Sequence, residues 1–468
     1  MCSSSILLLV ASIVLLVASI VLLVLLIMRP CRALLCNILL LLLCYMLPLC
    51  CPLHISLHPS IASIGASAWE ACRSPASSPF TSYAFLSLLE ESGCATKAKG
   101  WSPAHLAVYD VSEGTAESPA SPTSPPLAVA PLYGKQHSLG EFIFDQAWAE
   151  AAINAGLPYY PKLLGAAPFS PVAGRRVLLA PGAPPGRERE VLGAVAQFLE
   201  TLVTENDLGG AHVNFLTKGE ATHIAALPGW TRRSTLQFQF RNAHPETGLP
   251  FGSFEEYLST FRSKRRITVN RERRRVREAG YAVSAVAGLA IRELPGIART
   301  MHELYLSTID KQGPYGRAYL TREFFEGAVA GDFCESLVLI LARGPGGEIV
   351  AGTWNVVGGG DGGGEVFAGR HWGCVDASGS ASCLHFECCY YASVEYCIEA
   401  GVAFMNPGSG GGDYKFLRGF DPAACDSVHY LPHPGLRAAV KNFCQQEAAS
   451  IDEQIEYLAA ESAKKAKG

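Results

Sequence analysis

The chain has 468 residues and a formal net charge of −4, and 49% of its residues are hydrophobic and 17% are charged. This length is typical of two or three domains with a sizeable core, and the hydrophobic content excludes a mostly disordered chain. The slightly acidic balance excludes a protein whose whole surface coats nucleic acid.

The first 55 residues form a hydrophobic leader. Residues 6–28 carry no charge, and the segment VASIVLL at 10–16 is repeated at 17–23. A helix of this length measures about 35 Å and would cross the hydrocarbon core of a membrane. Three interpretations stay open: a membrane anchor or hairpin within residues 6–53, a targeting leader, or a start site assigned too early. We therefore expect a membrane-associated or organellar protein, with the plastid as one candidate organelle.

The spacing of the cysteines bears on the compartment. Six of the 16 cysteines lie in the leader, and the others form neither a disulfide framework nor the paired C-x-x-C motifs of zinc sites. We therefore expect the rest of the chain to fold in a reducing compartment and to hold no metal.

A first domain is predicted at residues 56–245. A Pro/Ser-rich segment at 112–126 is predicted to be a surface loop. The hydrophobic periodicity predicts, in chain order, a helix at 80–93, strands at 105–111 and 127–133, a helix at 145–155, a strand at 176–180, a helix at 188–204 and a strand at 211–216.

Polar residues are dense among aromatic residues in the middle of this domain. They suggest a recognition surface, with partly exposed edges of the core as the alternative. The residues are Lys135, His137, Glu141, Asp145, Tyr160 and Lys162.

A second domain is predicted at residues 246–450, followed by a charged tail at 451–468. Glycine-rich segments at 344–347 and 358–364 are predicted to be hairpin turns. The expected elements are a helix at 253–278, a strand at 281–288, helices at 295–310 and 321–330, strands at 337–342, 349–357 and 365–372, a helix at 384–400, a strand at 402–406 and a helix at 434–449. This order is that of GNAT-type N-acyltransferase folds, in which two adjacent parallel strands splay apart and admit the acyl donor.

Several ordered segments resemble one family. They are PFTSYAFLSLLEESG (79–93), GWSPAHL (100–106), PLYGKQHSLGEFIFDQAWAEAAINAGLPYYPKLLGAAPFSPVAGRR (131–176), RSKRRITVNRERRRV (262–276), AYLTREFF (318–325), AGRHWG (368–373), LHFECCYYASVEYCIEAG (384–401) and KFLRGFDP (415–422). From about Ile61 to Glu447 the chain resembles the FemAB-like family of GNAT-superfamily N-acyltransferases, usually described as peptidoglycan biosynthesis or recognition proteins. The resemblance implies an α/β fold of two packed GNAT-like domains. One segment departs from the family, because GSGGGDYK (408–415) stands where a sequence close to GAQGEHK is expected.

Residues 262–277 form a basic helix with nine lysines and arginines and a single acidic residue. The apolar stripe of this helix passes through Arg265 and Glu272. Because charges on a core-facing stripe are costly unless paired, we predict that these two residues pair in a cleft, whereas Arg273 lies on the surface. Arginine side chains there are suited to phosphate or carboxylate. A solvent-exposed face and a nucleic-acid patch are the alternatives.

The segment LHFE (384–387) opens the helix that follows the strand meander, where a helix N-terminus favours anions. Acyl transfer to an amine needs a base near the splayed strands. We predict Glu387 as this base and His385 as the second catalytic candidate, with capping of the helix as the alternative role. The segment RHWGCV (370–375) partly matches the acyl-CoA loop R/Q-x-x-G-x-G/A and departs from it at Val375.

Four basic residues are predicted to hold the phosphates of a donor or a developing negative charge: Arg265, Arg370, Lys415 and Arg418. Fem transferases carry a comparable basic segment at the position of Lys415 and Arg418, and simple surface charge is the alternative. The predicted function is transfer of an acyl or aminoacyl group to an amine of a small molecule or peptide, without a covalent enzyme intermediate.

The donors implied are acyl-CoA or aminoacyl-tRNA, with no tightly bound cofactor and no sequence-specific nucleic acid as partner. A ligand-recognition protein that kept the fold without catalysis is the first alternative, favoured by the departure at 408–415. A basic scaffold at a membrane surface is the second.

Overall fold

The computed structural model describes residues 53–110, 125–311, 316–361, 364–376, 383–410 and 412–461. From Leu53 onward the chain forms one compact unit. The hydrophobic leader up to Pro52 lies outside the described residues, and Leu53 already begins a strand. The predicted membrane-associated or organellar localisation is contradicted, because no helix in the described part of the chain is both long enough and apolar enough to cross a membrane.

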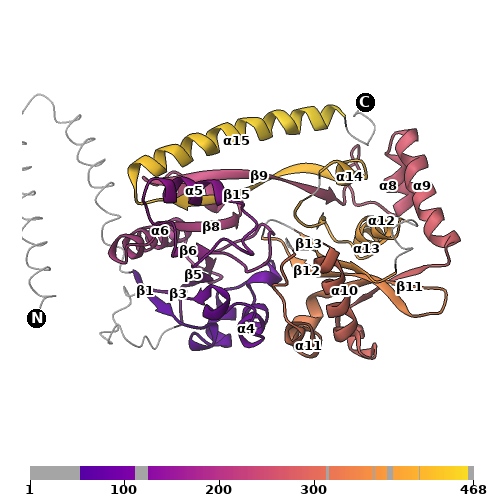
Figure 1. Ribbon diagram of the computed structural model, residues 1–468, viewed down its shortest axis with the longest axis horizontal. Coiled ribbons are helices and arrows are strands. Elements are labelled where there is room, and N and C mark those ends of the chain that lie inside the picture. Colours follow the sequence, from indigo (N-terminus) through magenta and orange to yellow (C-terminus); the bar gives the residue numbers. More distant parts are fainter. Residues whose placement is uncertain are drawn as a thin grey trace, which may run out of the picture. The chain divides into compact units, whose positions relative to one another are not determined.

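We call residues 53–245 the first half of this unit and the residues from 246 onward the second half. A mixed sheet of 11 strands runs through both halves (Figure 1). Its spatial order is β10-β11-β12-β13-β14-β9-β15-β8-β6-β5-β2. The strands are β2 (Trp101–Pro103), β5 (Leu132–Lys135), β6 (Lys162–Gly165), β8 (Ala211–Leu216), β9 (Trp230–Arg241), β10 (Ala282–Ala287), β11 (Leu337–Arg343), β12 (Ile349–Gly359), β13 (Glu365–Cys374), β14 (Phe404–Asn406) and β15 (Asp421–Tyr430).

A second sheet has four strands in the order β1-β3-β4-β7. They are β1 (Leu53–His58), β3 (His105–Asp110), β4 (Ala128–Ala130) and β7 (Leu178–Leu179). The single strand predicted at 127–133 is therefore two strands in different sheets. The chain changes sheet at Pro131, which has no N–H group to donate to a strand neighbour.

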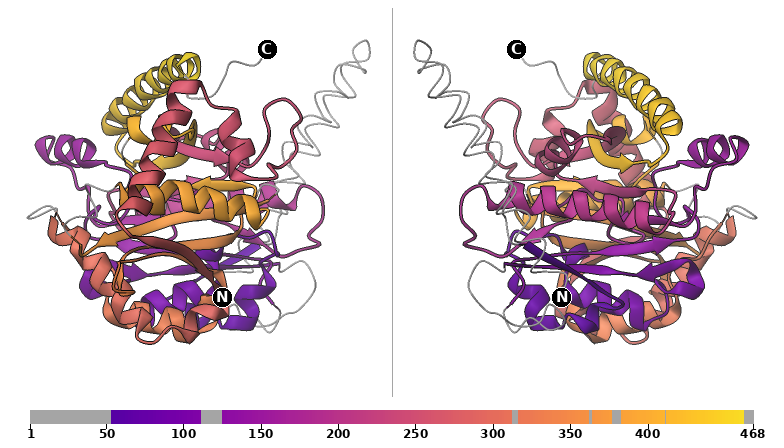
Figure 2. Two further views of the ribbon diagram at one scale, coloured as in Figure 1. Left: turned by 90° about the vertical axis from the view of Figure 1, so that its right-hand side faces the viewer. Right: turned by 90° about the vertical axis from the view of Figure 1, so that its left-hand side faces the viewer.

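Helices cover both faces of the large sheet, so the fold is mixed α/β, as predicted (Figure 2). Helix α15 (Pro434–Ala460) packs on β9 and β15, whereas α10 (Ile297–Lys311) packs on β12 and β13. The other α-helices of four or more residues in the described part of the chain are α3 (Ala66–Ala71), α4 (Tyr83–Glu91), α5 (Gln146–Asn154), α6 (Arg187–Glu205), α7 (Lys218–Ala225), α8 (Phe254–Ser259), α9 (Ser263–Glu278), α11 (Arg322–Ala330), α13 (Ala392–Glu399) and α14 (Asp413–Phe416).

The second half follows the predicted element order from β10 to β14. The helix predicted at 253–278 is interrupted and forms α8 and α9. The helix predicted at 384–400 begins with the short turn α12 (Leu384–Phe386), continues as a π-helical segment at Glu387–Tyr391 and ends as α13. The division into domains at 56–245 and 246–450 stays a prediction.

Candidate functional site

The two parallel strands β13 and β14 separate after a short contact. They pair over three positions, Val366–Ala368 with Phe404–Asn406. Beyond them β13 continues to Cys374, whereas the chain turns away from β14 into a glycine-rich segment in which Gly408 has a φ of 92°. A bulge at Arg370 also shifts the register of β13 against β12. Bulges of this kind re-aim side chains and often lie beside active sites.

Two cations near this separation, the buried Lys415 and the half-buried Arg370, have no acidic partner among the described residues. The Lys415 Nζ donates to the carbonyl of Gly408 at 2.5 Å, and Arg370 donates to the carbonyl of Phe169. Among the ion pairs between described residues, none involves Lys415 or Arg370. Burial lowers the pKa of Lys415 to about 8 and that of Arg370 to about 10. An anion placed here would supply the missing counter-charge.

His385 lies among aromatic rings beside these cations. Its ring centroid is 5.3 Å from that of Trp372, 5.6 Å from that of Tyr390 and 6.3 Å from that of Tyr414. Burial, followed by the charges of Arg418 and Lys415, lowers the pKa of His385 to about 4. The imidazole is therefore neutral at pH 7 and has a lone pair that can accept a proton.

Arg418 forms an ion pair with Glu272, which was predicted to pair with Arg265. Its Nη2 lies 2.9 Å from both carboxylate oxygens of Glu272, and its guanidinium carbon lies 3.4 Å from the ring centroid of Phe386. The Tyr391 hydroxyl also donates to Glu272. The predicted Arg265–Glu272 pair is therefore wrong. Seven residues along an α-helix separate two positions by about 10 Å, so Arg418 from the neighbouring segment reaches Glu272 more directly.

Glu387 is bound by an arginine and does not face His385. Its Oε1 accepts hydrogen bonds from Arg273, whose Nε is 3.0 Å away and which also binds Glu395 at 2.7 Å. Arg273 was predicted to lie on the surface, and this prediction is wrong. Burial raises the pKa of Glu387 while Arg273 opposes the shift. Because two residues along a helix differ by about 200° in direction, His385 and Glu387 point to different sides.

The structure thus brings together four of the six predicted site residues: Arg370, Lys415, Arg418 and His385. Their proximity appears in their mutual charge effects, since Lys415 and Arg418 act on His385 and Arg370 acts on Lys415. Arg265 and Glu387 lie outside this group, which we call the cationic cluster. The catalytic and binding roles of all six stay predictions. The segment compared with an acyl-CoA loop belongs to β13 up to Cys374, so it is a strand and not a loop.

The polar residues predicted as a recognition surface in the first half are largely buried. Lys162 donates to Glu141 at 2.8 Å, to Asp145 at 2.5 Å and to Ser138 at 2.8 Å. Lys135 lies 4.0 Å from Glu141. Four of the predicted residues therefore form a buried ionic network inside the domain.

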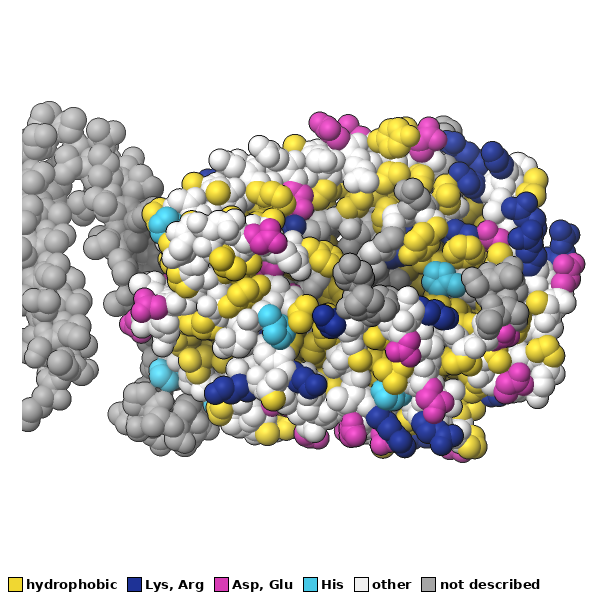
Figure 3. Space-filling model, in the orientation of Figure 1, with side chains coloured by type: hydrophobic (Ala, Val, Ile, Leu, Met, Phe, Trp, Pro, Cys, Tyr) yellow, Lys and Arg dark blue, Asp and Glu magenta, His cyan; other side chains and the backbone are white. Residues whose placement is uncertain are grey.

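The sequence does not indicate which residues pair with the site residues. Arg273 and Glu387 are 114 positions apart, and Glu272 and Arg418 are 146 positions apart. The exposed arginines of α9 lie at one end of the molecule, where Lys and Arg gather in Figure 3. These arginines therefore agree with the alternative prediction that the basic helix has a solvent-exposed face. The described residues hold no group of three or more His, Cys, Asp or Glu residues suited to a metal.

A family model described as FemAB-like, peptidoglycan biosynthesis/recognition, matches residues 60–466. No curated protein has a significant match to the sequence. Among solved structures, L-PGS from Bacillus licheniformis has a TM-score of 0.41 at 10% identity, covering 76% of this chain and 94% of that chain. A tandem GNAT protein from the clavulanic acid biosynthesis pathway has a TM-score of 0.38 at 11% identity, covering 82% and 99%. N-myristoyltransferase from Saccharomyces cerevisiae, with bound myristoyl-CoA, has a TM-score of 0.34 at 13% identity, covering 74% and 72%.

Proposed function

Because the chain belongs to the FemAB-like family, as its motifs predicted, we propose that it transfers an acyl or aminoacyl group from an anionic donor to an amine. The observation that carries this proposal is the buried Lys415 and the half-buried Arg370, which have no acidic partner among the described residues and lie where β13 and β14 separate. The phosphates of acyl-CoA are anions of the chemistry these cations would bind.

In the proposed reaction the amine of the acceptor attacks the carbonyl carbon of the donor. The new C–N bond forms, and the bond from the carbonyl carbon to the donor's sulfur or oxygen breaks. Arg370 and Lys415 hold the phosphates of the donor through charge-assisted contacts. Neutral His385 accepts the proton that the amine loses.

Glu387 is the alternative base. In the structure its carboxylate binds Arg273, and in this proposal it positions the helix that carries His385. The two roles are separable, since a base affects turnover directly whereas a positioning residue affects it through the helix.

The proposal is tested first by binding of coenzyme A to the full-length protein in isothermal titration calorimetry. We expect Lys415→Met to weaken binding about tenfold to a hundredfold, because it removes a charge-assisted contact. Lys441→Met is the matched control, since Lys441 is exposed on α15, and it should leave the affinity unchanged. Absence of binding to the wild type, or equal affinity in all three proteins, would overturn the proposed donor.

The chemistry is tested by acetyl transfer from acetyl-CoA to a panel of amines. We expect His385→Asn to lower kcat at least a hundredfold with the affinity for coenzyme A unchanged. Glu387→Gln should have the smaller effect. If Glu387→Gln abolishes turnover and His385→Asn does not, Glu387 is the base. Binding without turnover for any amine would favour the ligand-recognition alternative.

A further inference from the structure

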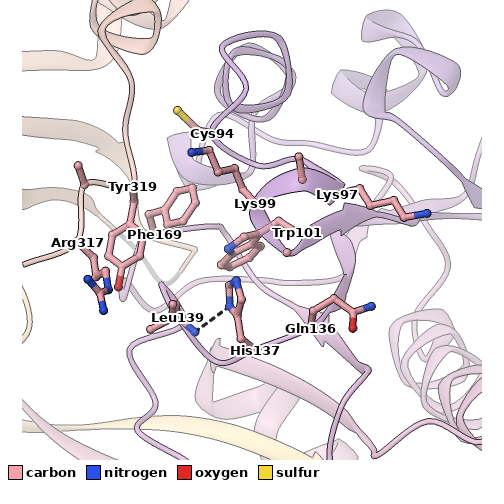
Figure 4. A pocket seen from close by; sticks show the side chains of 13 residues that line it. Cys94, Lys97, Lys99, Trp101, Gln136, His137, Leu139, Phe169, Arg317 and Tyr319 are labelled. Carbon is pink, nitrogen blue, oxygen red and sulfur yellow. Dashed lines mark hydrogen bonds between the residues drawn. The ribbon is translucent and has the colours of Figure 1, made fainter. Parts of the chain in front are cut away.

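A cavity of about 510 Å³ lies apart from the cationic cluster (Figure 4). It is lined by Cys94, residues 97–101, 136, 137 and 139 and Phe169 of the first half, together with residues 317–319 of the second half. No residue of the cationic cluster is among its lining residues. Its volume is typical of a site for a small molecule.

The lining combines positive charge with flat aromatic rings, and none of its described residues is acidic. The rings of Phe169 and Tyr319 are nearly parallel at 17°, with centroids 5.2 Å apart, and the centroid of Trp101 lies 5.0 Å from that of Phe169. Figure 4 shows Arg317 beside Tyr319, whereas Lys97 points away from the rings. This chemistry fits a ligand that has an anionic group and a planar ring.

The walls of the cavity are held in place by close packing. The Nδ1 of His137 accepts a hydrogen bond from the Leu139 backbone N–H at 3.2 Å. A Cβ on Gly100 would lie 2.4 Å from the His137 ring, and one on Gly140 would lie 2.7 Å from the Phe169 ring. Two glycines are therefore required for these side chains to reach their positions.

Phe169 connects this cavity to the cationic cluster. Its ring lines the cavity, while its carbonyl oxygen accepts the hydrogen bond from Arg370. Its backbone has a φ of 57°, which is costly for a bulky residue. Strain of this kind persists where the surrounding structure determines the conformation, and it is often found at ligand sites. A ligand that shifts the backbone of Phe169 would also displace the carbonyl that accepts the hydrogen bond from Arg370.

We propose that this cavity binds a small anion bearing a planar ring, and that Phe169 couples its occupancy to Arg370.

The binding claim is tested on the full-length protein with phenyl phosphate as the probe, by isothermal titration calorimetry. Inorganic phosphate and phenol, which each have one of the two features, should bind at least tenfold more weakly. Arg317→Ala should weaken binding of phenyl phosphate about tenfold. Arg299→Ala is the matched control, because Arg299 is an exposed arginine on α10 outside the cavity, and it should have no effect.

Three results would contradict binding of phenyl phosphate in this cavity. They are absence of binding to the wild type, equal affinity in wild type and Arg317→Ala, and loss of binding in Lys415→Met. The last result would assign the probe to the cationic cluster.

The coupling is tested by measuring the affinity for coenzyme A with and without saturating phenyl phosphate. We expect a change of at least fivefold, and by reciprocity coenzyme A should change the affinity for phenyl phosphate by the same factor. Unchanged affinities would overturn the coupling through Phe169. If phenyl phosphate binds in the cavity while coenzyme A does not bind at all, the proposed function fails and the site stands.

Discussion

The two halves of the molecule each bury a group of cations, and the two groups differ in what neutralises them. In the first half, Lys162 is 1% exposed and donates to the carboxylates of Glu141 and Asp145. In the second half, Lys415 is 3% exposed and donates to a backbone carbonyl. The charge of a buried cation between two carboxylates is compensated within the protein, whereas the charge of one without a carboxylate is available to a ligand.

The acid–base behaviour of the two lysines differs in the same way. Burial alone would lower the pKa of Lys162, but Glu141 and Asp145 raise it above its usual value. Burial lowers the pKa of Lys415 to about 8 with little opposition. The first lysine therefore keeps its charge to a higher pH than the second, whose pKa lies close to physiological pH.

The largest expected effect is a difference in stability between variants of these two lysines. Lys162→Met removes the main counter-charge of two buried carboxylates, leaving Glu141 with the more distant Lys135, and should lower the free energy of unfolding by about 3–5 kcal/mol. Lys415→Met removes an unpaired buried charge and should change it by less than about 1 kcal/mol. Urea denaturation of both variants measures the difference. Equal losses would show that the two lysines do not differ in role.

The next effect compares two glutamates within the second half. Glu272→Gln leaves the buried Arg418 without its carboxylate and should cost about 2–3 kcal/mol of unfolding free energy. Glu387→Gln should cost about 1 kcal/mol, because Arg273 keeps Glu395 as a partner. The same denaturation experiment checks the order, and the reverse order would contradict the assignment of Glu272 as the main counter-charge.

The next prediction concerns the pH dependence of ligand binding at the cationic cluster, which is measured on the folded protein. Since the folded pKa of Lys415 is lowered to about 8, its positive charge is present below pH 8 and is lost as the pH rises through that value. Binding of acetyl-CoA should therefore weaken between pH 7 and 9.5 by up to about 1.4 kcal/mol per pH unit. Lys415→Arg keeps its charge over this range and should bind with little pH dependence. A wild type as insensitive to pH as Lys415→Arg would contradict the role of Lys415.

The smallest effect is expected at Arg265, which the sequence placed in the same cleft as Glu272. Arg265 is half-buried on α9 and takes part in none of the ion pairs between described residues. Arg265→Ala should change the free energy of unfolding by no more than about 0.5 kcal/mol and should leave the affinity for coenzyme A unchanged. A loss of several kcal/mol would restore Arg265 to the site.

Much of the second half could be predicted because its turns and strands are locally encoded. The predicted turn at 344–347 has Gly347 at a φ of 88°, which glycine adopts readily. The long strands β9 and β15 were missed. In β15 the sequence DPAACDSVHY lacks the alternation of a half-buried strand, and its pairing with β8 and β9 depends on residues far away in the chain.

The sequence predicted the members of the site but not their partners, because the partners lie far away in the chain. Motif resemblance located Arg370, Lys415 and Arg418, which the fold does bring together. It gave no information on their partners, because Glu272 meets Arg418 only when α9 packs beside the π-helical segment Glu387–Tyr391. Pairing across such sequence distances is a property of the tertiary fold, so periodicity within one helix led to Arg265 in place of Arg418.

The position of β15 has a consequence for synthesis on the ribosome. This strand lies between β8 and β9, although it is made about 180 residues later than β9 (residues 421–430 against 230–241). Until it emerges, the edges of β8 and β9 that it will pair with stay open, and such edges are sites of association with other chains. A chain that stops before Asp421 should therefore aggregate instead of yielding a stable N-terminal half, so the first half becomes a complete structure only after nearly all of the protein has been translated.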